Sequence, residues 1–138
     1  MGASTYTQTN VLNALLRGEA MPLPTGTFVS LHTGDPGATG ANEVATTDWP
    51  AYVRRQAEGS GAIGTGWTTP TGGLSLNLNQ LIYPAKDGAS PITISHFAVW
   101  DALTAGNCLD AGTLATPRIL NASDIVVFDV GSLSVTVS

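Results

Sequence analysis

ITISHFAVWD, residues 92–101, is the clearest strand signal in the chain. β-Branched and aromatic residues dominate it, and these side chains favour strands. Strand alternation places two apolar sets on opposite faces: Ile92, Ile94, Ala98 and Trp100 on one, and Phe97 and Val99 on the other. We therefore expect a long strand whose second half is buried on both faces, with sheet neighbours elsewhere in the chain.

Five further segments have strand character: 27–32, 74–80, 107–115, 124–130 and 132–138. Residues 74–80 (LSLNLNQ) alternate strictly, which predicts Leu74, Leu76 and Leu78 inward and the polar residues outward. The 16 Gly and eight Pro provide turns between short strands. About eight strands without a linker predict one all-β domain, an antiparallel β-sandwich of jelly-roll type spanning the chain from 1 to 138.

One short stretch near the start follows helical spacing instead. Val11, Leu12, Leu15 and Leu16 form one apolar face, which predicts a helix over 10–17. Thr9 or Asn10 would cap its start, and Gly18 would end it in a left-handed turn. Residues 1–9 are small and polar, and we expect them to form a flexible arm.

Charge and cysteine content exclude several classes of protein. Charged residues make up 11% of the chain, against about 25% in an average soluble protein. The net charge is −5, and Arg54-Arg55 is the one basic pair, so direct nucleic-acid binding is not expected. No apolar run approaches the roughly 20 residues that span a bilayer, and no signal peptide opens the chain, so we expect no membrane partner and synthesis in the cytoplasm. The single cysteine, Cys108, is expected to be a buried thiol.

The glycine-rich stretch LHTGDPGATGANEV, residues 31–44, invites a test for phosphate or metal binding. A phosphate-binding loop needs a lysine and a hydroxyl residue after its last glycine, and here Glu43 would repel a phosphate. His32, Asp35 and Glu43 offer ligand atoms, but their spacing matches neither a zinc nor a calcium motif. The favoured interpretation is that Asp35 begins a GDPG turn within a long connection.

Motifs for covalent catalysis also fail. No G-x-S-x-G elbow is present, and no pair among the ten acidic residues stands out as a general acid and base. We therefore expect no catalytic site, no cofactor and no bound metal.

Several motifs nevertheless occur in a recognisable order: NALLRGEA, LHTGDP, ANEV, YVRRQ and HFAVWDA. This order resembles small virion proteins of tailed bacteriophages, which carry tail-fibre-like or capsid-decoration labels. Size and pattern are also similar to the jelly-roll capsid cement (decoration) protein of short-tailed phages such as the Bordetella phage. The resemblance implies a structural protein on the capsid exterior that binds and stabilises an HK97-type shell. Its implied partners are the phage major capsid protein and a second copy of itself across two-fold positions.

Two other functions stay open. One is a tail fibre or tail-tip component of the virion. The other is a carbohydrate-binding β-sandwich, in which aromatic rings would stack on sugars: Trp49, Trp67, Trp100 and Tyr52. Of these, Trp100 is expected in the core and Trp49, beside Pro50, is expected to be the most exposed.

The loop GDPGATGANEV (34–44), with DWPAYVRR (48–55) after it, is the predicted contact surface for the capsid. Ordering so much glycine is costly, and a partner would help to hold it. Its candidate contact residues are Asp35, Glu43, Trp49, Tyr52, Arg54 and Arg55, which include residue types enriched at interfaces. In an extended chain Arg54 and Arg55 point to opposite faces, so one would face the partner and the other would pair with Asp48 or Glu58.

The terminal strand SLSVTVS (132–138) bears on self-association. At a sheet edge its unpaired backbone groups would need cover or pairing. Two-fold contacts are the commonest symmetric arrangement, so we expect a homodimer.

Overall fold

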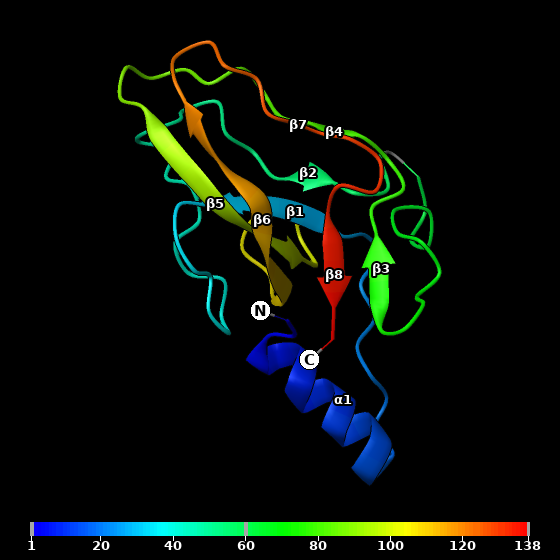
Figure 1. Ribbon diagram of the computed structural model, residues 1–138. Helices are drawn as coiled ribbons and strands as arrows, with labels where there is room; N and C mark the ends of the chain where they lie inside the picture. Colours follow the sequence, from blue (N-terminus) through cyan, green and yellow to red (C-terminus); the bar gives the residue numbers. More distant parts are fainter. Residues whose placement is uncertain (1, 60, 138) are drawn as a thin grey trace.

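The computed structural model describes residues 2–59 and 61–137 and has one helix followed by strands that pair antiparallel throughout (Figure 1). The expected all-β, sandwich-like fold with one short N-terminal helix is confirmed. The elements are α1 (Thr5–Arg17), β1 (Phe28–His32), β2 (Arg55–Gln56), β3 (Leu74–Leu76), β4 (Leu81–Ile82), β5 (Ile92–Trp100), β6 (Cys108–Leu120), β7 (Val127–Phe128) and β8 (Ser134–Thr136).

The main sheet has the strand order β2-β1-β5-β6. The long strand β5 lies in its middle, with Phe28 of β1 opposite Trp100 and Leu120 of β6 opposite Ile92. As expected, the second half of β5 is buried on both faces, since Phe97, Ala98, Val99 and Trp100 all lie in the interior. This strand therefore organises the core.

A β-bulge changes the faces predicted for β5. The register with β6 shifts between Ile94 and His96, where two steps along β5 are matched by five along β6, and the alternation of buried side chains along β5 is broken. Ile94 consequently packs with Phe97 and Val99, whereas Ala98 and Trp100 form a separate cluster on the other face. The prediction that Ile94 shares a face with Trp100 was wrong for this reason.

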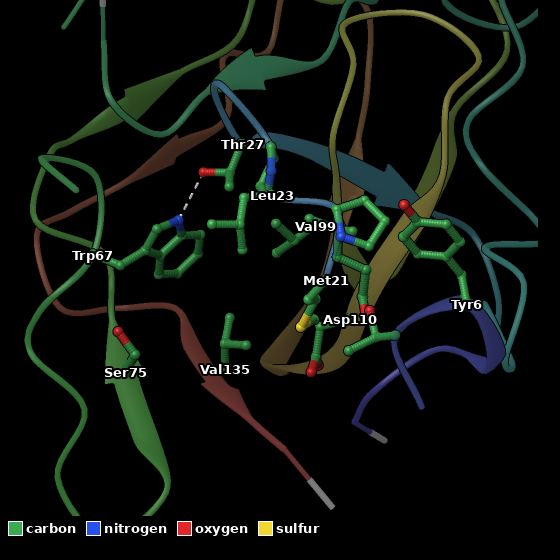
Figure 2. A pocket seen from close by; sticks show the side chains of 13 residues that line it. Tyr6, Met21, Leu23, Thr27, Trp67, Ser75, Val99, Asp110 and Val135 are labelled. Carbon is green, nitrogen blue, oxygen red and sulfur yellow. Dashed lines mark hydrogen bonds between the residues drawn. The ribbon is translucent and has the colours of Figure 1, made fainter. Parts of the chain in front are cut away.

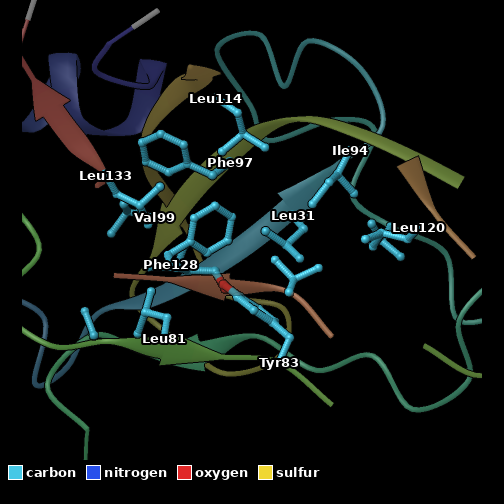
Figure 3. Packing of buried hydrophobic residues seen from close by; sticks show 14 of the residues in the cluster. Leu31, Leu81, Tyr83, Ile94, Phe97, Val99, Leu114, Leu120, Phe128 and Leu133 are labelled. Carbon is cyan, nitrogen blue, oxygen red and sulfur yellow. The ribbon is translucent and has the colours of Figure 1, made fainter. Parts of the chain in front are cut away.

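Two small sheets, β3-β8 and β4-β7, form the second layer over one face of the main sheet (Figure 3). Leu81, Tyr83, Phe128 and Leu133 from this layer pack in one cluster with the Phe97 face. The hydroxyl of Tyr83 crosses the interface and donates to the carbonyl of Val29 at 2.9 Å. The layers are thus joined by apolar packing and a buried hydrogen bond.

Residues 74–80 do not form the strand that their alternation predicts. Regular pairing stops at Leu76, and Leu74 and Leu78 are 38% and 41% exposed. Asn77 points inward instead, because its side chain satisfies three backbone groups: Leu133 N–H, Asn79 C=O and Asp129 C=O. The need to provide hydrogen-bond partners for buried backbone groups, and not the apolar pattern, decides which side chains point inward here.

The helix begins at Thr5, five residues before the expected start, and Ser4 caps it by accepting a hydrogen bond from Thr7 N–H at 3.1 Å. Gly18 ends it with φ 68°, as expected. Residues 2–9, expected to form a flexible arm, are instead bound to β6: Ala3 bridges Asp110, and Ser4 N–H donates to Leu109 C=O at 3.0 Å. The Ser4 hydroxyl donates to the carbonyl of Cys108. Residue 1 lies outside the described residues.

Candidate functional site

The glycine-rich loop folds back on itself after β1. Asp35 accepts a hydrogen bond from Gly37 N–H at 2.7 Å, which is the turn predicted from GDPG. The carbonyl of Pro36 accepts from both Gly40 and Ala41. A Cβ added to Gly40 would lie 2.4 Å from the Trp100 ring, so only glycine lets the loop lie this close. The loop is a packed cover over the second face of the sheet.

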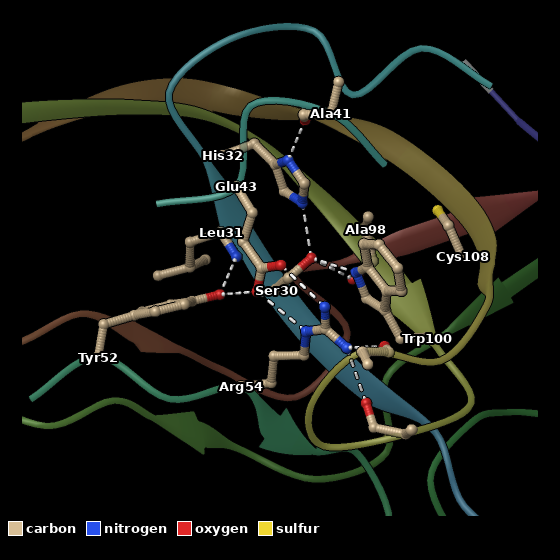
Figure 4. A network of polar contacts seen from close by, with 12 residues as sticks. Ser30, Leu31, His32, Ala41, Glu43, Tyr52, Arg54, Ala98, Trp100 and Cys108 are labelled. Carbon is tan, nitrogen blue, oxygen red and sulfur yellow. Dashed lines mark hydrogen bonds and ion pairs between the residues drawn. The ribbon is translucent and has the colours of Figure 1, made fainter. Parts of the chain in front are cut away.

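Beneath this loop lies a network centred on Arg54 and Glu43 (Figure 4). The guanidinium binds the carboxylate at two points, Nε to Oε1 at 2.9 Å and Nη2 to Oε2 at 2.8 Å. Its Nη1 donates to the carbonyls of Ala102 and Ala105, and its plane lies 3.9 Å over the Trp100 ring. Arg54 therefore joins the loop, the segment before β2 and the β5–β6 turn.

Tyr52 connects the same carboxylate to the sheet. Its hydroxyl donates to Glu43 at 2.9 Å and accepts from Leu31 N–H at 3.0 Å. The Tyr52 hydroxyl, and not a neighbouring strand, accepts the hydrogen bond of Leu31 N–H. Without Tyr52 this backbone group would be buried without a partner.

A second chain of hydrogen bonds runs from the loop through His32 to Trp100. His32 Nδ1 lies 2.6 Å from the carbonyl of Ala41, and Nε2 lies 2.6 Å from the Ser30 hydroxyl. A carbonyl can only accept, so Nδ1 carries the proton and Nε2 accepts from Ser30. The Ser30 oxygen in turn accepts from the Trp100 indole N–H at 2.7 Å.

Burial and hydrogen bonding set the charges in this network. Burial lowers the pKa of His32 below its ordinary value, outweighing the nearby Ala41 carbonyl and Glu43 carboxylate that raise it. Burial opposes ionisation of Glu43, but hydrogen bonds from Arg54 and Tyr52 outweigh it and lower the pKa of that carboxyl. Burial also raises the pKa of Tyr52 far above its ordinary value. At neutral pH the network contains a neutral imidazole, a neutral phenol and one ion pair.

This chemistry suits a structural role. Ser30 and His32 stand at the distance of a nucleophile and its base, but both side chains are 0% exposed, so a substrate has no access to them. Among the described residues, no group of three or more His, Cys, Asp or Glu side chains is arranged to hold a metal ion. Cys108 is buried, as expected, and burial raises the pKa of its thiol to about 11. No helix in the described ranges has the length and apolarity to cross a membrane.

The structure brings together three of the six predicted contact residues, Glu43, Tyr52 and Arg54, but directs them into the domain. Arg54 is 6% exposed and pairs with Glu43, so the expected partner Asp48 or Glu58 was wrong for it. Arg55 is half-buried, and its Nε donates to the carbonyl of Ile82 at 2.8 Å. Asp35 remains exposed in the loop. Contact with the capsid through this region stays a prediction. Asp35, Arg55 and the loop backbone would have to make that contact.

Trp49 was expected to be the most exposed aromatic residue and is 0% exposed. It packs against Tyr52 with ring centroids 5.4 Å apart. The buried Lys86 holds the surrounding segment, because its Nζ donates to the carbonyls of Asp48, Asp87 and Gly88 at 3.1–3.2 Å. Trp49 and Trp100 are therefore both unavailable for stacking on a sugar, which removes two of the four rings on which carbohydrate binding depended.

Trp67 belongs to a different buried group. Its indole N–H donates to the Thr27 hydroxyl at 2.8 Å, and that hydroxyl donates to Glu58 at 2.7 Å. Glu58 also accepts from Thr27 N–H at 2.9 Å. The carboxylate thus fixes the start of β1 and, through Thr27, the position of the half-buried Trp67 ring.

Outside these networks, one face of α1 is apolar and exposed. No residue of this helix is buried, and Leu15 and Leu16 are 76% and 78% exposed. Leu12 is also exposed and lines a shallow hollow of about 290 Å³ together with Val137, which follows β8. We call the four exposed residues Leu12, Leu15, Leu16 and Val137 the helix patch. Figure 1 shows α1 extending away from the sheets, on the side where the chain ends.

Sequence reasoning missed two functional features. It identified the apolar face of the helix but not its exposure, because a 3.6-residue period shows which side is apolar and not what covers it. It also missed Asp110, a buried acid in β6, because the bulge that turns this side chain inward depends on pairing with β5. An Asp within the apolar strand segment CLDAGTL was the one local signal.

The comparisons with known proteins agree with the early resemblance to phage virion proteins. No curated protein matches the chain. One family model, described as podophage GP4 fiber I protein gp80, matches residues 2–136. The chain therefore belongs to this family and is a structural protein of a short-tailed bacteriophage virion.

Proposed function

We propose that this protein is a non-enzymatic structural subunit of a fibre on the virion and that copies of it associate through the helix patch. The family description, which names a fiber protein, supports the fibre assignment. The observation that carries the assembly proposal is the exposure of the three leucines of α1. Contiguous apolar surface of this kind marks interaction sites in soluble proteins.

The chemistry of the patch favours a second copy of the chain as its occupant. Residues 5–16 contain no charged side chain, so the surface presents nothing for a charged partner to match. The same surface on another copy is equally apolar and uncharged, which makes it self-complementary in a two-fold contact. Strand β8 pairs only with β3 among the described strands, and it ends beside this patch.

Sedimentation velocity on the purified protein tests the association. The wild type should sediment as an oligomer, and the Leu15→Ser/Leu16→Ser double variant as a folded monomer. Ile119→Ser is the matched control, because Ile119 is 68% exposed on β6, away from the patch, and this variant should remain oligomeric. A monomeric wild type at the highest soluble concentration, or a double variant as oligomeric as the control, would contradict the proposal.

Capsid cement is the second candidate function. It is supported by the resemblance to jelly-roll decoration proteins and by the exposed loop around Asp35, which is held rigid without covering any catalytic group. In this role the partner would be the major capsid protein and the location the capsid exterior. Electron microscopy of virions that carry a gold-labelled tag on this protein separates the two roles. The label would lie on the capsid shell for a cement protein and on the tail for a fibre subunit.

A further inference from the structure

An apolar pocket of about 240 Å³ lies at the base of α1, between that helix, the proline-rich segment 21–24 and the two sheet layers. Figure 2 shows Trp67 and Val135 on one side of it, Tyr6 on the other and Asp110 between them. Met21, Leu23 and Val99 add to the apolar lining. Cavities of this size hold small organic molecules when their walls are apolar.

Asp110 is the unusual member of the lining. Val99 pairs with Asp110 and Trp100 with Cys108, so Leu109 is the extra residue of a β-bulge. The bulge turns Leu109 and Asp110 toward the same side, and both line the pocket. Asp110 is 6% exposed, and its Oδ1 has no hydrogen-bond partner among the described residues.

Three other polar side chains of the pocket wall have partners within the protein. The Thr7 hydroxyl donates to Leu109 C=O at 2.7 Å, and the Ser75 hydroxyl donates to Thr68 C=O at 2.7 Å. The Trp67 N–H donates to Thr27, whose hydroxyl donates to Glu58. These hydrogen bonds hold the wall in place, and Asp110 is the charged side chain of the lining, with an Oδ1 that a ligand can use.

We propose that this pocket binds a small organic amine, with the ammonium group on the Asp110 carboxylate and the apolar body against Trp67, Val99 and Val135. A buried carboxylate oxygen without a donor is unfavourable, and an ammonium would supply Asp110 Oδ1 with both a donor and the opposite charge. Burial raises the pKa of Asp110 to about 6, outweighing the backbone hydrogen bond of Ala111 and the positive charge of the chain N-terminus, which lower it. Above that pH the group is ionised and attracts a cation. A carboxylic acid would be repelled, and a neutral alcohol would supply a donor without the charge.

Benzylamine, benzyl alcohol and benzoate are suitable probes, because they share one ring and differ in the head group. Binding at pH 7.5 is followed by ¹H–¹⁵N NMR at the Trp67 indole N–H and the Asp110 amide, with affinities from titration. Benzylamine should bind at least tenfold more tightly than benzyl alcohol, and benzoate should not bind. Equal affinity for benzylamine and benzyl alcohol, or no chemical shift change at the highest benzylamine concentration, would overturn the proposal.

Two variants separate the carboxylate from the apolar walls. Asp110→Asn keeps the shape and should reduce benzylamine affinity to that of the alcohol, whereas the exposed Asp129→Asn should leave the preference intact. Val135→Phe fills the pocket and should weaken amine and alcohol alike, which provides a test even where Asp110→Asn does not fold. A preference that persists in Asp110→Asn would refute the assignment. Binding of an acetyl-Leu-Lys-Leu-amide peptide without binding of benzylamine would also refute it, because the occupant would then be a partner protein's lysine.

Discussion

Arg54 and Glu43 form a two-point ion pair in which the arginine is almost fully buried and the glutamate keeps about a quarter of its side chain exposed: 6% against 24%. The same arginine also donates to two backbone carbonyls and lies over the Trp100 ring. The pair therefore connects three segments that are distant in sequence, and its residues hold the domain together instead of presenting charge to a partner.

Arg54→Met should destabilise the protein by about 2–4 kcal/mol, because it leaves two carbonyls without this donor and a half-buried carboxylate with the Tyr52 hydroxyl but no counter-charge. The expected loss is measured from urea unfolding followed by tryptophan fluorescence. Arg17→Met is the matched control, since the Arg17–Glu19 pair is on the surface, with 68% and 49% of the side chains exposed. That control should change stability by less than about 0.5 kcal/mol. Equal effects of the two variants would show that the buried pair has no special role.

Gly40→Ala should destabilise the protein more than Gly37→Ala. Both glycines have positive φ, 82° and 61°, so both variants bear the conformational cost of about 1 kcal/mol that alanine meets there. Only at Gly40 does the added Cβ also meet the Trp100 ring, at 2.4 Å, whereas nothing lies within 4 Å at Gly37. Thermal unfolding of the two variants measures the difference, and an equal loss would mean that the loop does not pack on Trp100.

The stability of the protein should depend on pH through His32. Because burial lowers the pKa of His32 in the folded state, the unfolded chain takes up a proton at about pH 6.5 before the native protein does. The contribution of His32 is therefore complete above pH 6.5 and is lost as the pH falls from 6.5 through the lower native pKa. The charged and titratable groups that act on it are Glu43, Arg54 and His96.

Asp110 acts in the opposite direction. Its pKa is raised to about 6 in the folded protein, so its contribution to the free energy of unfolding is complete below pH 3.8 and is lost as the pH rises through about 6. The His32 effect is therefore measured as a difference between variants. Free energies of unfolding from urea titrations at pH 5 to 8 should fall less steeply below pH 6.5 for His32→Asn than for the wild type. A His32→Asn slope equal to that of the wild type would refute the role of His32.

The sequence was sufficient for the elements whose formation is local. Alternation predicted β1 and β5, and the Gly18 and GDPG turns followed from residues that favour those conformations. It was insufficient wherever long-range pairing decides. The register shifts between β5 and β6 change the face on which a side chain lies. Ile94 therefore packs with other neighbours than predicted, and Asp110 is buried. Trp49 is covered by a segment that Lys86 holds from far along the chain.

The candidate site was predicted in part for the same reason. Glu43, Tyr52 and Arg54 were selected because arginine and aromatic residues favour interfaces, and the structure does bring them together. Their partners are one another, however, which no local pattern within residues 43–54 indicates. The apolar face of the helix was visible at its 3.6-residue period, but its exposure depends on how little of α1 contacts the sheets.

Incorporation into virions is the decisive test of whether this protein forms a fibre through the helix patch. Particles that lack this protein would be mixed with wild type, Leu15→Ser/Leu16→Ser or Ile119→Ser protein, purified and imaged by cryo-electron microscopy for difference density. We expect added fibre density at the tail with the wild type and Ile119→Ser, and its loss with the double variant, whose fold is checked by circular dichroism. Density of equal occupancy for all three proteins, or density that covers the capsid shell and not the tail, would contradict this expectation.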